Sequence, residues 1–212
     1  MPAKIEHIQA IIMCKAPVEG RVKTRLMAKH TAQQATALHC VMAKTVIERA
    51  KRIFKHVCLA VDDINHPFFE SFDLPVYPQG EGDLGERMVF LMERLENKNG
   101  HALLFLGTDS PHMADKRLYD TAALLQKGYE VVLGAVEDGG YDLIAMKQPY
   151  PKLFKGISWS SDLVLKQSLA LIEKAHLKAY VLDASFDVDT PEMLARAVDA
   201  GWDVTLPHLV EK

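Results

Sequence analysis

The sequence predicts a single α/β domain with a mostly parallel sheet. Short apolar runs that suit buried strands alternate with longer stretches in which apolar residues recur every three or four positions, as on one face of a helix. This alternation is typical of right-handed β-α-β units, in which helices cover both faces of a parallel sheet. A chain of 212 residues suits one such three-layer domain, and we expect residues 1–212 to form one unit.

In the first half of the chain, the pattern predicts three strands and two helices. The strands are expected at 8–14, 57–61 and 74–77. A helix should begin at Thr31, because Gln34 completes a capping box, and should run to about Phe54. A second amphipathic helix is expected over 84–95, with Asp83 as its N-cap.

In the second half, strands are expected at 102–106, 130–135 and 180–182. The segment 141–146 is either a further strand or the close of a hairpin, and one antiparallel strand is expected in the otherwise parallel sheet. Helices are expected from about Lys116 to Gln126, from Ser161, and from Pro191, because proline suits the first turn of a helix.

The composition excludes several classes of protein. The chain has 25 basic and 28 acidic residues, so its net charge of −3 gives no general attraction for a nucleic acid. Its first nine residues are polar, unlike a secretory signal, and it lacks the roughly 18 consecutive apolar residues of a membrane span. We therefore expect a cytoplasmic protein. Its three cysteines, Cys14, Cys40 and Cys58, have no CxxC spacing and are expected to be free thiols.

The loop after the first predicted strand is strongly cationic. Residues 15–25 (KAPVEGRVKTR) hold four cations and one hydroxyl. Lysine and arginine both suit phosphate oxygens, so this loop is a candidate polyphosphate cradle, and the alternative is a solvated basic turn. The loop is not a P-loop, because that motif would need glycines where Pro17 and Val22 stand.

The loop at 80–85 (GEGDLG) has the spacing of a dinucleotide-binding fingerprint. Glu81 and Asp83 would, however, place carboxylates against a pyrophosphate, and the loop follows the third predicted strand instead of the first. Either the glycines of this loop let the backbone approach a flat base or ribose, or the loop is only a tight turn with a helix cap. A dinucleotide-dependent oxidoreductase is the least favoured function.

Three later loops are acidic. Asp109 lies at the carboxyl end of the predicted central strand, Asp138 lies in EDGGY at 137–141, and Asp187 and Asp189 lie two apart in DVDTP. Several aspartates beside a polyphosphate predict a Mg²⁺ or Mn²⁺ ion. Taken alone, Asp187 or Asp189 is equally suited to capping the last helix.

All these loops follow strands of the predicted sheet. Ligands on parallel sheets bind beyond the carboxyl ends of the strands, so the loops should converge on one crevice. Trp159 is a candidate for stacking on a sugar or base, or else a tryptophan of the core or rim. His112, like the other histidines, has no ligand-like spacing and is expected to be structural.

Six motifs together resemble a bacterial family of unassigned function that is related to the GT-A nucleotide-diphospho-sugar transferases. They are CKAPVEGRVKTRL at 14–26, QGEGDLGERM at 79–88, GTDSP at 107–111, DGGYDLI at 138–144, ISWSS at 157–161 and DVDTP at 187–191. The resemblance spans most of the chain. It implies a GT-A-like, Rossmann-like sandwich of three layers, α/β/α, with a mostly parallel sheet.

The resemblance also implies roles for individual residues. Phosphate contacts would come from Lys15, Gly20, Lys23, Thr24 and Arg25, and base contacts from Gln79, Gly82 and Gly85. The metal would be bound by Asp109 and by either Asp187 or Asp189. The acceptor side would be formed by Asp138, Gly139, Gly140 and Tyr141, with Trp159 beside them.

We therefore expect a metal-dependent transferase that uses Mg²⁺ or Mn²⁺ and moves a nucleotidyl or glycosyl group from a nucleotide or nucleotide sugar to a small acceptor. Its expected catalytic residues are Asp109, Lys23 and Asp138. Typical nucleotidylyltransferases have several glycines in the first loop, whereas this chain has only Gly20, so the type of transfer stays open. The alternatives are a nucleotide-binding regulatory module without turnover and a partner-binding protein. A homodimer is the expected form if the chain associates.

Overall fold

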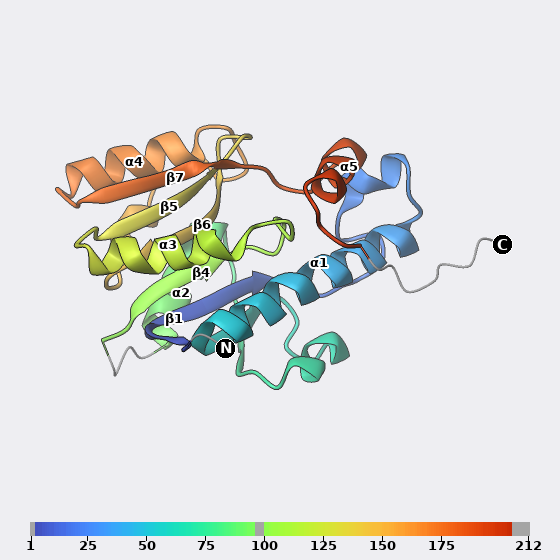
Figure 1. The fold of residues 1–212 in the computed structure, drawn as a ribbon, viewed down its shortest axis with the longest axis horizontal. Coiled ribbons are helices and arrows are strands. Elements are labelled where there is room, and N and C mark those ends of the chain that lie inside the picture. Colours follow the sequence, from blue (N-terminus) through green and yellow to red (C-terminus); the bar gives the residue numbers. More distant parts are fainter. Residues whose placement is uncertain (1–2, 96–99, 205–212) are drawn as a thin grey trace.

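Seven strands form one sheet in the order β3-β2-β1-β4-β6-β5-β7 in the computed structural model, which describes residues 3–95 and 100–204 (Figure 1). The strands are β1 (Ile5–Cys14), β2 (Phe54–Val61), β3 (Val76–Pro78), β4 (Ala102–Leu106), β5 (Val131–Val136), β6 (Tyr141–Met146) and β7 (Ala179–Ser185). The β1 strand lies parallel to β2 and β4, whereas β6 runs antiparallel to β4 and β5. The expected mixed sheet with one reversed strand is therefore confirmed, and 141–146 is both a strand and the close of a hairpin.

Helices cover both faces of the sheet. The apolar sides of α1 (Ala32–Ile53) and α3 (Asp115–Gln126) pack against one face, and those of α2 (Leu84–Arg94) and α4 (Val164–Lys174) pack against the other. Both core clusters are built mainly from strand residues that are buried on both sides, as the uninterrupted apolar runs require. The expected three-layer α/β/α arrangement is confirmed.

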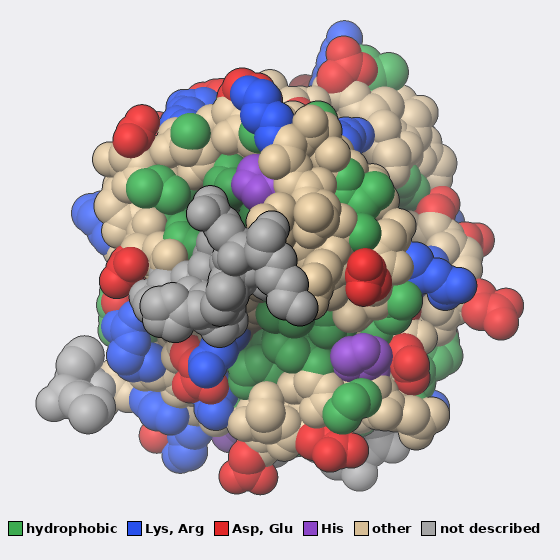
Figure 2. Space-filling view, turned by 90° about the vertical axis from the view of Figure 1, so that its right-hand side faces the viewer, with side chains coloured by type: hydrophobic (Ala, Val, Ile, Leu, Met, Phe, Trp, Pro, Cys, Tyr) green, Lys and Arg blue, Asp and Glu red, His purple; other side chains and the backbone are tan. Residues whose placement is uncertain are grey.

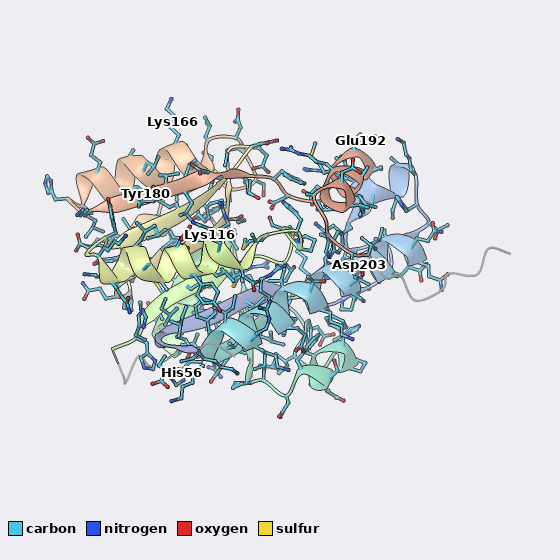
Figure 3. All side chains as sticks on the ribbon, viewed as in Figure 1. His56, Lys116, Lys166, Tyr180, Glu192 and Asp203 are labelled. Atoms are coloured by element: carbon cyan, nitrogen blue, oxygen red, sulfur yellow. The ribbon has the colours of Figure 1, made fainter. Side chains whose placement is uncertain are left out.

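One helix, α5 (Pro191–Asp199), lies beyond the carboxyl ends of the strands, beside the 3₁₀ helix η1 (Thr24–Ala28) and the start of α1 (Figure 1). Its apolar side shares a small core with Met42, Phe186 and Trp202. Glu192, labelled at the start of α5 in Figure 3, lies 3.1 Å from Lys29 Nζ just after η1. These contacts hold α5 against the segment that follows β1, at the edge of the sheet formed by the carboxyl ends of its parallel strands.

Local capping signals determine where several helices begin. Thr31 and Gln34 form the expected capping box of α1, and Asp83 forms a second one with Glu86 at α2. Pro191 occupies the first turn of α5, as expected. Two further 3₁₀ helices, η2 (Pro67–Phe72) and η3 (Pro151–Phe154), also begin with proline.

The structure corrects several predicted boundaries. The helix expected from Ser161 begins at Val164, because Ser161 Oγ accepts a hydrogen bond from Leu163 N and donates one to Ser158 O in a turn. The β1, β2 and β7 strands are longer than expected, and β3 lies at Val76–Pro78 instead of 74–77. These additions are partly exposed, so the apolar runs did not include them.

The described part of the chain contains no helix that is both long enough and apolar enough to cross a membrane. Cys14, Cys40 and Cys58 are free, as expected.

Candidate functional site

A crevice of about 870 Å³ lies where the carboxyl ends of β1, β3, β4, β5 and β7 meet. The loops that were expected to converge do so here. The residues of interest that line the crevice are Lys15, Lys23, Thr24, Arg25, Gln79, Gly82, Asp109, Asp138, Gly140, Tyr141, Trp159, Asp187 and Asp189. The crevice lies at this edge because the loops that follow parallel strands all begin at the carboxyl ends of those strands.

The cationic loop is held at its start by two hydrogen bonds. Asp62 Oδ1 accepts a hydrogen bond of 2.6 Å from Ala16 N, and His39 Nε2 donates one of 2.9 Å to Lys15 O. Val22 and Leu26 are buried under the loop, whereas the side chains between them are mostly exposed. The loop therefore has a fixed backbone and presents cations, including Lys15 and Arg25, to the crevice.

Lys23 is the exception among these cations, because it points inward. Its Nζ lies 2.6 Å from Asp109 Oδ1, 2.8 Å from Asp189 Oδ1 and 2.9 Å from Val188 O. Only 5% of its side chain is exposed. Arg25 Nη1 lies 3.3 Å from the other oxygen of Asp189. The aspartates of two distant loops are thus joined by one ammonium.

Charge pairing decides the protonation of this cluster. Burial opposes ionisation of both Asp109 and Lys23, but the attraction between them outweighs it. As a result the pKa of the Asp109 carboxyl is lowered and the pKa of the Lys23 ammonium is raised. Both groups carry full charge at neutral pH.

Asp187 lies in the same cluster but has no ion pair among the described residues. Ser110 Oγ lies 2.6 Å from Asp187 Oδ1, and Val188 N donates a 2.8 Å hydrogen bond to Asp109 O, which ties the two loops together. Burial, followed by the negative charge of Asp109, raises the pKa of Asp187 to about 7. A further cation would relieve this repulsion, so the cluster lacks positive charge on the Asp187 side.

A buried ion pair that the sequence did not predict lies at the wall of the crevice, where Asp142 is one of the lining residues. Arg117 of α3 lies 3.0 Å from Asp142 Oδ2 of β6, and their side chains are 13% and 3% exposed. The same guanidinium donates to Asp183 O and Ala135 O, where the pairing of β5 with its neighbours becomes irregular. Burial raises the pKa of Asp142 to about 6, although Arg117 counteracts the rise.

Gly134 makes room for this pair. A Cβ at this position would lie 2.1 Å from Asp142 Oδ1 and 2.8 Å from Arg117 Nη2. A charged residue inside the otherwise apolar strand YDLIAM was a signal that could have identified Asp142. No comparable signal identified Arg117 as its partner.

The expected base contacts have protein partners of their own. Gln79 is buried, its Nε2 donates to Ala60 O and Cys14 O, and its Oε1 accepts from Arg87 Nη1. Arg87 also donates to Gly82 O. Gln79 therefore joins the ends of β1 and β2, and Arg87, which lines the crevice, is a donor that the sequence analysis missed.

Three predicted glycines do not line the crevice. Gly20 has a φ of 76° and forms an exposed turn of the cationic loop. A Cβ on Gly85 would lie 2.7 Å from both Phe154 O and Trp159 Nε1, and one on Gly139 would lie 2.2 Å from Asp162 O. Gly85 and Gly139 therefore allow close packing beside the crevice, which is a backbone role.

The expected acceptor side lies on the β5–β6 hairpin. Asp138 is exposed, and its Oδ1 accepts a 2.9 Å hydrogen bond from Gly140 N. Tyr141 and Trp159 line the crevice with their rings edge to face, 6.4 Å apart, and Trp159 also packs on Phe154. The hairpin thus offers a carboxylate and an aromatic wall. The ring of His112, for which no functional role was predicted, stacks on Phe186 with centroids 3.9 Å apart.

The donor set suits an ion bound jointly with a ligand. Among the described residues, no group of three or more His, Cys, Asp or Glu side chains could hold a metal alone. Mg²⁺ is, however, commonly bound by one or two carboxylates with substrate phosphates and water. Asp109 and Asp187 both line the crevice, and the negative charge of Asp109 raises the pKa of Asp187. Two such carboxylates fit that type of site.

Solved structures share this fold. A proposed nucleotide-diphospho-sugar transferase from Desulfovibrio desulfuricans G20 is similar with a TM-score of 0.79 and 26% identity, over 88% of this chain and 84% of that chain. A 4-diphosphocytidyl-2C-methyl-D-erythritol synthase aligns with a TM-score of 0.62 and 10% identity, over 93% and 100% of the two chains. A CMP:2-keto-3-deoxy-manno-octonic acid synthetase complexed with CTP gives 0.59 and 14%, over 93% and 99%. The fold is thus that of GT-A-like and nucleotidyl transferases.

A search of curated proteins by sequence gave no match. The family description "Uncharacterized protein conserved in bacteria" (DUF2064) matches residues 42–161, a stretch that contains the GTDSP and DGGYDLI loops. The chain belongs to this bacterial family, DUF2064, as the resemblance of its motifs implied.

Proposed function

We propose that this protein is a metal-dependent transferase that moves a nucleotidyl or glycosyl group from a nucleotide or nucleotide sugar to a small acceptor. One observation carries the proposal. A single crevice at the carboxyl edge of the sheet brings the cationic loop together with Asp109, Asp187 and Asp189. Fixed cations opposite a carboxylate cluster are what a phosphate with its counter-ion needs.

The donor would lie along the cationic loop. Lys15, Thr24 and Arg25 are exposed in the crevice and would bind phosphate oxygens, while Arg87 and Gly82 would lie beside the base. Asp109 and Asp187 would hold Mg²⁺ or Mn²⁺, because Asp189 already has two cationic partners. When bound, the ion would neutralise charge that develops on the phosphate oxygens.

The acceptor would lie on the hairpin, between Asp138 and the wall formed by Tyr141 and Trp159. Its hydroxyl oxygen would attack either the α-phosphorus, with release of pyrophosphate, or the anomeric carbon, with release of a nucleoside diphosphate. Asp138 would accept the hydroxyl proton, since it is an exposed carboxylate on this side of the crevice. In the protein without ligand, the Lys23 ammonium holds the carboxylates of Asp109 and Asp189 together.

The proposed partners are small molecules. Acidic and basic side chains are intermixed on the face seen in Figure 2, and the net charge is −3, so this face offers no basic surface for a nucleic acid. We place the protein in the cytosol, where such nucleotides occur and where its three free cysteines would stay reduced. A twofold symmetric homodimer is the form we would expect if it associates.

The proposal is tested by thermal shift with a panel of nucleotides and nucleotide sugars, with and without Mn²⁺. A ligand present at about 100 times its Kd should stabilise the protein by about 2.7 kcal/mol. We expect at least one compound to bind in a Mn²⁺-dependent way, and Asp109→Asn to abolish this dependence. Asp120→Asn, on the exposed side of α3, is the matched control.

Turnover then separates an enzyme from a regulatory module. Phosphorus NMR with the ligand and a mixture of small acceptors should show pyrophosphate or nucleoside diphosphate release. Binding without any release would support the regulatory alternative, and a panel without any binding would contradict both.

A further inference from the structure

The environment of the Lys23 ammonium is complete in this structure. An ammonium has three N–H donors, and Nζ has three acceptors within 2.9 Å, namely Asp109, Asp189 and the Val188 carbonyl. No donor is left for a phosphate oxygen. In this arrangement Lys23 acts as a cation of the carboxylate cluster and does not act as a phosphate ligand.

The same carboxylate is proposed to bind a metal ion. Asp109 is 47% exposed towards the crevice, so an ion entering with a nucleotide can reach it. A divalent ion and an ammonium that share Asp109 repel each other at a separation of a few ångströms. The two cations therefore compete for the charge of this aspartate.

Asp189 does not depend on Lys23 alone for a positive partner. Lys23 is the residue that precedes η1, and Arg25 Nη1 lies on the Asp189 oxygen that Lys23 does not use. Asp189 would therefore keep one cation after Lys23 moves. Lys15 and Arg21 are already exposed in the crevice and would provide the first attraction for a phosphate.

We propose that Lys23 is a tethered cation which occupies the carboxylate cluster until a nucleotide phosphate draws it away, so that the divalent ion binds tightly only together with the nucleotide. This inference rests on the proposed function for the identity of the ligand. It makes the binding of metal and nucleotide mutually dependent. The competing possibility is that Lys23 replaces the metal permanently.

Mn²⁺ binding without nucleotide tests the inference. Calorimetry or electron paramagnetic resonance should show that Lys23→Met, which keeps the length of the side chain but removes its charge, binds Mn²⁺ about tenfold more tightly than the wild type, a difference of about 1.4 kcal/mol. Lys29→Met is the matched control. It removes one lysine charge just after η1, but Lys29 is exposed and does not line the crevice, so its Mn²⁺ affinity should change by less than about threefold.

A second measurement uses the unaltered protein, in case Lys23→Met does not fold. Acetylation of Lys23 by acetic anhydride, quantified in peptides by mass spectrometry, should be slow in the free protein and should rise several-fold when Mn²⁺ is added at saturation. Lys116, which is exposed on α3, is the internal reference for the labelling rate.

The outcomes are distinct. An unchanged Mn²⁺ affinity in Lys23→Met overturns the inference, because it shows that the ammonium and the ion do not compete. Lys23 labelling that does not respond to saturating Mn²⁺ also overturns it and favours permanent replacement of the metal. Absence of Mn²⁺ binding in every variant overturns it as well. If Lys23→Met gains Mn²⁺ affinity but no nucleotide binds to any variant, competition between Lys23 and the ion stands, whereas its coupling to a nucleotide and the proposed function both fail.

Discussion

Asp187 gives the most direct test of the electrostatics, because it is a carboxylate that is mostly buried and also lies near the negative charge of Asp109. Its pKa is about 7, compared with an ordinary value of 3.8. Between these two pH values the folded protein binds a proton that the unfolded chain does not, so the free energy of unfolding must fall as pH rises through this window. Below about pH 4 both states are protonated and the penalty is absent.

The size of the effect follows from the shift. Each pKa unit corresponds to about 1.36 kcal/mol, so a shift of about three units would cost at most about 4 kcal/mol at pH 8. Water in the crevice screens part of the repulsion from Asp109, and we expect about 2 kcal/mol. Asp187→Asn removes the charge but keeps an oxygen that can accept the hydrogen bond from Ser110.

The assay is urea denaturation of the wild type and Asp187→Asn at pH 5 and pH 8. The variant should be more stable by about 2 kcal/mol at pH 8 and by much less at pH 5. Asp142, whose pKa is also raised, is present in both proteins and cancels in the comparison. Asp183→Asn, an exposed carboxylate on β7, is the control for loss of one charge. Equal stabilisation of Asp187→Asn at both pH values would refute the reasoning.

Two further predictions concern the ion pair behind the crevice. Arg117→Met should lower the free energy of unfolding by about 3 kcal/mol, because the buried Asp142 loses its cation and must either stay charged without it or take up a proton. Adding Asp142→Asn should restore part of this loss, and a double variant no more stable than the single one would count against the carboxyl group as the cause. Gly134→Ala should cost about 2 kcal/mol or more, because its Cβ would lie 2.1 Å from Asp142 Oδ1. Gly107→Ala, whose Cβ would have its nearest contact at 3.6 Å, should lose much less in the same thermal or urea denaturation; equal losses would contradict the steric argument.

The sequence was most informative where the signal is local. The β4 strand lies at Ala102–Leu106 as predicted, because an uninterrupted apolar run marks a strand that is buried on both faces. The capping box at Thr31 likewise depends only on residues three apart. Strand ends were predicted less well. The first residues of β1, Ile5–His7, are partly exposed and lie where the pairing with β2 shifts register after Ile5, and nothing in their composition distinguishes them from a loop.

For the site, strand direction predicted which loops meet but could not predict which side chains pair. Lys23 was expected to bind phosphate. In this structure its partners are Asp109, Val188 and Asp189, which lie far from it in the sequence and are brought to it only by the folded chain. Gln79 was expected at the base, and its full set of protein hydrogen bonds depends on three strand ends meeting. Pairing of this kind is a property of the packed structure and leaves no periodic trace in the sequence.

The hydrogen bonds from Lys23 to Val188 and Asp189, in the segment after β7, have a consequence for the order in which parts of the chain can fold. Ala16 and Asp62 can join early in synthesis, whereas Lys23 has no acceptor from Val188 or Asp189 until residues beyond 187 have been added. All seven strands can therefore be paired before Lys23 has made its contacts with Val188 and Asp189. Local unfolding of the segment around α5 would break only these last contacts. The part of the crevice wall that contains Asp187 and Asp189 could therefore be lost and regained without unfolding the strands that support it.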